Sequence, residues 1–66
     1  MKHYVSFKIN GTGNLRGMYV DAPRLTKDSL TDAIIDALHL NPRNVDFIQF
    51  FEVKEFGANK IDISRW

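Results

Sequence analysis

Apolar residues recur with helical spacing in only one stretch of the chain, residues 25–42. Five of them follow the i, i+3, i+4, i+7, i+8 pattern and so share one stripe of a helix: Leu30, Ala33, Ile34, Ala37 and Leu38. Thr26 suits the N-cap, with Ser29 three residues later and Leu25 placed before the cap to contact Leu30. Because Pro42 cannot continue the hydrogen-bond ladder, we expect a helix from about Thr26 to His39.

Extended segments flank this helix on both sides. Residues 2–9 alternate between apolar and polar side chains, residues 10–14 favour a reversal, and residues 18–20 resume the alternation, which predicts an antiparallel hairpin. After the helix, residues 45–54 are rich in aromatic and β-branched side chains, residues 56–59 suit another reversal, and residues 61–63 alternate again. The sequence therefore predicts a single α+β domain over residues 1–66, a small ββαββ fold with one helix packed on a four-stranded antiparallel sheet.

The segment at residues 45–54 offers two faces, and only one can meet the helix. One face carries Val45, Phe47, Gln49, Phe51 and Val53, and the other carries Asp46, Ile48, Phe50, Glu52 and Lys54. We expect the first face to lie under the helix because it is more apolar, although Gln49 does not fit there.

With this choice, the sheet face away from the helix carries a patch of large side chains: Tyr4, Tyr19, Ile48 and Phe50, with Trp66 near them. Aromatic residues are enriched in the cores of protein interfaces, and exposed apolar patches are often contact sites. The patch predicts binding to a protein partner or to a second copy of the chain. Nucleic acid is the alternative, since sheet-based binders stack bases on aromatic rings. Equal numbers of basic and acidic residues on this face argue against it: Lys8, Lys54 and Lys60 with Asp46, Glu52 and Asp62.

A second candidate surface is an acidic ridge on the helix. Asp28, Asp32 and Asp36 are four residues apart and so line up on one side, with Ile35 at the border. Like charges at this spacing cost ~0.2–0.5 kcal/mol per pair, and the helix dipole offsets that only in the first turn. We therefore predict that Asp32, Ile35 and Asp36 contact a basic surface on the partner.

Composition narrows the function further. The 66 residues have a formal net charge of +1, so the chain lacks the basic excess of a nonspecific nucleic-acid binder. They include no cysteine, so a thiolate metal site cannot form. His3 and His39 lack metal-ligand spacing, and no nucleophile motif is present, so we expect no catalysis, no metal and no cofactor. No signal peptide or long apolar run is apparent, which leads us to expect a cytoplasmic protein without membrane association.

No family is assigned from motifs. Residues 21–33, DAPRLTKDSLTDA, resemble the opening of HicB-type antitoxins, but the fuller Phe-Pro-Asp-Leu-Pro-Gly run of that family is missing. The size and the acidic ridge are similar to those of small phage-encoded inhibitors such as anti-CRISPR proteins. That similarity implies an inhibitor or adaptor as one form of the interaction module.

Overall fold

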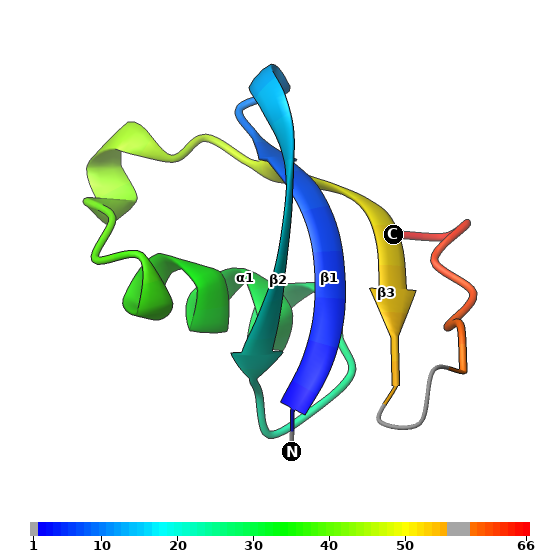
Figure 1. Ribbon diagram of the computed structural model, residues 1–66. Helices are drawn as coiled ribbons and strands as arrows, with labels where there is room; N and C mark the ends of the chain where they lie inside the picture. The colour runs from blue at the N-terminus through cyan, green and yellow to red at the C-terminus, as the bar shows by residue number, and fades with distance from the viewer. Residues whose placement is uncertain (1, 56–58) are drawn as a thin grey trace.

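Three antiparallel strands and one α-helix make up the fold in the computed structural model, which describes residues 2–55 and 59–66 (Figure 1). The elements along the chain are β1 Lys2–Ile9, β2 Thr12–Asp21, α1 Lys27–Ala37, a short 3-10 helix η1 Pro42–Asn44, and β3 Ile48–Lys54. The strand order is β2-β1-β3, so β1 is the central strand and both of its neighbours run antiparallel to it. The predicted α+β class is confirmed.

The turn between β1 and β2 is built on Asn10 and Gly11. Both residues have positive φ angles, 55° and 66°, as the two central residues of a type I′ hairpin require. The Asn10 side chain also ties the hairpin to the segment before β3: its Oδ1 accepts from the backbone amides of Asp46 and Phe47, and its Nδ2 donates to the Asn44 carbonyl. The hairpin turn therefore positions the start of β3.

Helix α1 begins as expected and ends two residues earlier than expected. The Thr26 hydroxyl accepts a hydrogen bond from the Ser29 amide at 3.2 Å, which confirms the N-cap. The last helical residue is Ala37, because His39 adopts a positive φ of 53° that is incompatible with a further helical turn. Among the described residues, no helix is long and apolar enough to cross a membrane.

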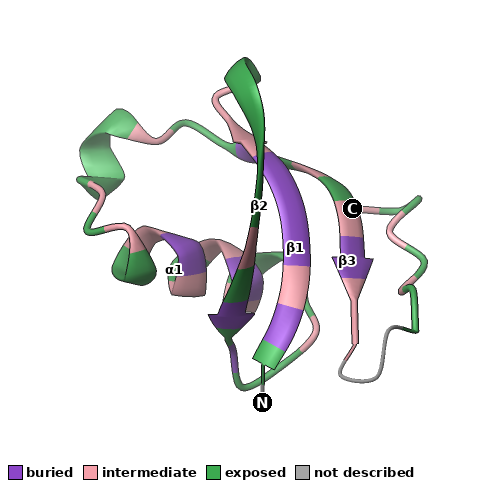
Figure 2. Cartoon of the chain, viewed as in Figure 1, coloured by how far each residue is buried: buried purple, intermediate pink, exposed green. Residues whose placement is uncertain are grey.

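The core lies between α1 and one face of the sheet (Figure 2). Its buried apolar residues come from every strand, from α1 and from the β2–α1 connection: Val5, Phe7, Val20, Ala22, Leu30, Ile34, Ile48 and Val53. The alternation along β1 correctly placed Val5 and Phe7 inside. The half of β2 nearest the hairpin turn is exposed, as the green ribbon in Figure 2 shows.

The predicted orientation of β3 is wrong over its first half. Ile48 is 2% exposed and lies in the core, whereas Phe47 and Phe51 are 50% and 47% exposed. The cause is a β-bulge: Phe50 pairs with Phe7 and Glu52 pairs with Ser6, which leaves Phe51 as an extra residue between them. The alternation changes phase at Phe51, so Ile48 before the bulge and Val53 after it both point toward the helix.

The fourth strand is not confirmed. Lys60 forms one isolated bridge with Lys54, and the Ile61 amide donates to the Val53 carbonyl. The chain then turns, with the Asp62 carboxylate accepting from the Ser64 amide, so no ladder develops over the described residues of this segment. Its apolar residues pack against the core without strand pairing. The reversal predicted at residues 56–59 falls mostly outside the described residues.

Candidate functional site

The partner-binding residues predicted from the sequence fall in three separate places. Tyr4 and Tyr19 lie on the sheet face away from α1, which we term the open face. Ile48 and Phe50 do not belong to that face. The three predicted helix residues line a hollow near the C-terminal end of α1: Asp32, Ile35 and Asp36.

Ile48 and Phe50 are corrections to the predicted patch. Ile48 is a core residue, and Phe50 is half-buried, packed against the core and against Trp66 with ring centroids 5.3 Å apart. Both were placed on the open face by strict alternation, which the bulge at Phe51 interrupts. The predicted apolar patch therefore does not form on the open face, because only Tyr4 and Tyr19 of its four residues lie there.

Tyr4 and Tyr19 form an aromatic pair on the open face. They are opposite each other on β1 and β2, and their rings meet edge to face with centroids 5.4 Å apart. The Tyr4 ring extends over Gly17, and a Cβ at this position would overlap the tyrosine hydroxyl unless the ring moved away. Glycine at this edge-strand position thus lets the Tyr4 ring lie close to the backbone.

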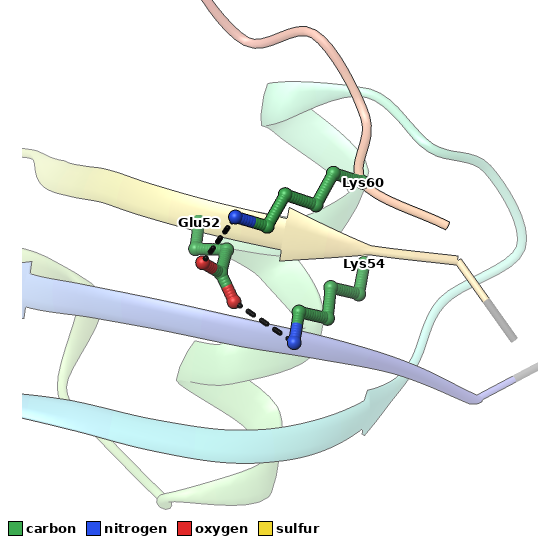
Figure 3. Close-up of polar contacts among 3 residues, drawn as sticks. All are labelled: Glu52, Lys54 and Lys60. Atoms are coloured by element: carbon green, nitrogen blue, oxygen red, sulfur yellow. Dashed lines mark ion pairs between the residues drawn. The ribbon is translucent and has the colours of Figure 1, made fainter. Parts of the chain in front are cut away.

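Charged side chains surround this aromatic pair. Figure 3 shows the Glu52 carboxylate between Lys54 and Lys60, in front of the strands and away from the helix. The Nζ–O distances are 3.3 Å to Lys54 and 3.5 Å to Lys60, and the Lys54 ammonium also stands 5.8 Å from the Tyr4 ring centroid. The hydrogen bond from Lys54 and the positive charge of both lysines lower the pKa of Glu52 from its usual value.

Phe51 is an open-face residue that the sequence did not predict. Lys8 alternates with the buried Phe7 and so points to the open face, and its ammonium stands 5.8 Å from the Phe51 ring centroid. This cation–π contact places the Phe51 ring on the same side of the sheet. Period-two counting assigned Phe51 to the core because it assumes an uninterrupted strand, and the bulge breaks the count at this residue.

The hollow at the end of α1 is formed by the way the helix terminates. The His39 amide donates to the Asp36 carbonyl at 3.2 Å, and the Leu40 amide donates to the Ile35 carbonyl at 3.0 Å. With His39 at positive φ, these are the two hydrogen bonds of a Schellman motif, which turns the chain back across the last helical turn. The turn carries Leu40 next to Ile35 and leads into Pro42.

The resulting hollow has an apolar floor and an acidic side. It is open to solvent, has a volume of about 520 Å³, and is lined by Asp32, Ile35, Asp36, His39, Leu40 and Pro42. Asp32 and Asp36 are exposed, whereas Ile35 and Leu40 are half-buried. Helical spacing predicted the α1 side of this surface. It did not predict the side formed by His39, Leu40 and Pro42, for which only the proline signalled a helix end.

The hollow can hold an apolar side chain and pair a cation with the carboxylates beside it. The open face instead offers flat rings with ammonium groups next to them.

Comparison with known proteins gives no relative for this arrangement. No family model, curated protein or solved structure matches the chain.

Proposed function

We propose that this chain is a non-catalytic interaction module that binds a protein partner through the acidic hollow at the C-terminal end of α1. The observation that carries the proposal is the convergence of Asp32, Ile35 and Asp36 with Leu40 and Pro42 around one concave surface. A hollow with an apolar floor and charge on one side resembles a binding site more closely than a plain solvated helix face does.

The chemistry of the hollow suits a basic segment of the partner. An apolar side chain would cover Ile35 and Leu40, while a lysine or arginine next to it would pair with Asp32 and Asp36. Placing two carboxylates one helical turn apart is unfavourable for the isolated helix and favourable once a cation lies between them.

The open face is a weaker candidate for the protein contact. Its predicted apolar content depended on Ile48 and Phe50, and both belong to the helix side of the sheet. The rings that remain there are interspersed with lysines, whereas the central parts of protein interfaces are depleted of charge.

Affinity capture with matched helix variants tests the proposal. The bait is the full chain, immobilised and incubated with nuclease-treated lysate of the source cell. Three versions are compared: the unaltered chain, Asp32→Asn with Asp36→Asn, and the control Asp28→Asn. Asp28 belongs to the same ridge but does not line the hollow, so its variant removes a similar helix charge elsewhere.

We expect one protein to be retained by the unaltered chain and by Asp28→Asn and to be lost from the double variant. The double variant should remain folded by circular dichroism, because removing like-charge repulsion does not destabilise the helix. Retention that is equal on all three baits, or no retained protein on the unaltered chain, would contradict a protein contact at the hollow.

A further inference from the structure

The open face carries an excess of positive charge, contrary to the balance expected from the sequence. Alternation and strand register place Lys2, Lys8 and Lys54 on this face with Asp21 and Glu52, and Lys60 joins them through Glu52. Asp46 precedes β3, and the Asp62 carboxylate accepts from the Ser64 amide in the segment after Lys60, so the two carboxylates that balanced these lysines in the sequence pattern are not on the strands of this face. Among the described residues of this face, four ammonium groups therefore stand against two carboxylates.

Aromatic rings lie among these charges at two positions. Tyr19 is 70% exposed and stands beside Tyr4 at one end of the face. Phe51 is 47% exposed and stands beside Lys8 further along β1. Tyr19 lies on β2 and Phe51 on β3, the two edge strands, so the two positions are two strand spacings apart across the sheet, about 10 Å.

We propose that the open face binds single-stranded nucleic acid, with bases stacked on Tyr19 and Phe51 and phosphates held by the lysines between and around them. Exposed rings on a sheet combined with cations are the features by which proteins bind single strands without reading a long sequence. Gly17 lets the Tyr4 ring lie close to the sheet, and the neighbouring Tyr19 ring is the most exposed of the large apolar side chains in the described part of the chain.

An acidic peptide would use the lysines and leave the rings without a specific role. The rings therefore favour the nucleic-acid strand, because every base has a flat face that can stack. No sugar contact enters this arrangement, so RNA and DNA strands should bind alike. The proposal does not depend on the hollow at the end of α1, since neither Asp32 nor Asp36 belongs to the open face.

Fluorescence anisotropy with labelled ten-nucleotide strands of uridine and of thymidine tests the proposal on the full chain. We expect both strands to bind with similar affinity at 50 mM salt, and the slope of log K against log salt to be about −1.4 to −2.1, as for two or three neutralised phosphates. Tyr19→Ser should weaken binding by ~5- to 100-fold through lost stacking, whereas Tyr19→Phe should retain it.

Lysine variants give the matched electrostatic control. Lys8→Ala should weaken binding and reduce the salt slope by about 0.7, whereas Lys27→Ala removes an exposed cation from α1 and should leave binding unchanged. Each variant is first shown to be folded by circular dichroism. Absence of binding at 200 μM protein overturns the proposal, as does equal binding by the unaltered chain and Tyr19→Ser. A decaglutamate peptide that binds as tightly as the nucleic-acid strands also overturns it, because charge alone would then account for the interaction.

Discussion

Asn10 should contribute more to stability than its partly exposed position suggests. Its side chain makes three hydrogen bonds across more than 30 residues of sequence: Oδ1 accepts from the Asp46 and Phe47 amides at 2.7 and 3.2 Å, and Nδ2 donates to the Asn44 carbonyl at 2.9 Å. These bonds hold the segment that leads into β3. Asn10→Ala removes all three and also places alanine at a positive φ.

The expected loss in the free energy of unfolding is about 2.5–4 kcal/mol. Partly solvated hydrogen bonds contribute ~0.5–1 kcal/mol each, toward the lower end of the usual range, and alanine in the left-handed region costs about 1 kcal/mol more. A domain of this size has a total stability of roughly 3–10 kcal/mol, so the variant should be severely weakened.

Urea denaturation followed by circular dichroism measures this loss. Asn10→Gly separates the two contributions, since glycine tolerates the backbone angle and lacks the side-chain bonds. It should be more stable than Asn10→Ala by about 1 kcal/mol and less stable than the unaltered chain. A loss below ~0.5 kcal/mol for Asn10→Ala would show that these bonds do not hold the hairpin to β3.

Three further predictions concern the bulge in β3, the C-terminal end of α1 and the ion pairs of Glu52 with Lys54 and Lys60. Ile48→Ala should lower the free energy of unfolding, measured by urea denaturation, by about 2–5 kcal/mol, and Phe51→Ala by at most about 1 kcal/mol, because only the Ile48 side chain is buried. A larger loss for Phe51→Ala would mean that Phe51, and not Ile48, faces the core, as the alternation pattern predicted. His39→Gly should raise the unfolding free energy by ~0.5–1 kcal/mol by relieving the positive φ, and a less stable variant would indicate that the imidazole makes a stabilising contact. Because the pKa of Glu52 is lowered in the folded state, its contribution to stability is present above the unfolded-state pKa and is lost as pH falls through the lower folded-state value. Glu52→Gln should therefore flatten the acid side of a curve of unfolding free energy against pH. An unchanged curve would show that the ion pairs of Glu52 with Lys54 and Lys60 do not stabilise the fold.

The helix and the hairpin were predictable because their signals are local. The apolar stripe and Thr26 set the start of α1, and the Asn10-Gly11 pair has the residue types that a type I′ turn needs. Each of these features depends on residues that are close together in the sequence. Tertiary packing did not have to be known.

The orientation of β3 could not be read in the same way. Alternation assumes one residue per position on each strand, and the bulge at Phe51 breaks that count. Its position is set by pairing with β1, which is distant in sequence. Two poor fits in the sequence, Gln49 on the assumed inner face and Ile48 on the outer one, were the only local signs of the change.

The candidate sites differ in the same way, since one depends on local helical spacing and the other on pairing between distant strands. Asp32, Ile35 and Asp36 share a helix side by spacing alone, and all three line the hollow; their role in binding a partner stays a prediction. The rest of the hollow follows from a Schellman motif with histidine in the position that glycine usually occupies, and this gives no sequence signal. Strand-based patches were less secure, because a one-residue shift moves every side chain to the opposite face.

A protein contact at the hollow is tested most directly by amide chemical-shift mapping. Isotope-labelled chain is titrated with the protein captured from nuclease-treated lysate, and the shifts are followed residue by residue. We expect the largest shifts on Asp32, Ile35, Asp36 and Leu40, with little change at Tyr4 or Tyr19. Shifts confined to the open face, with Asp32 and Asp36 unperturbed, would contradict a contact at the hollow.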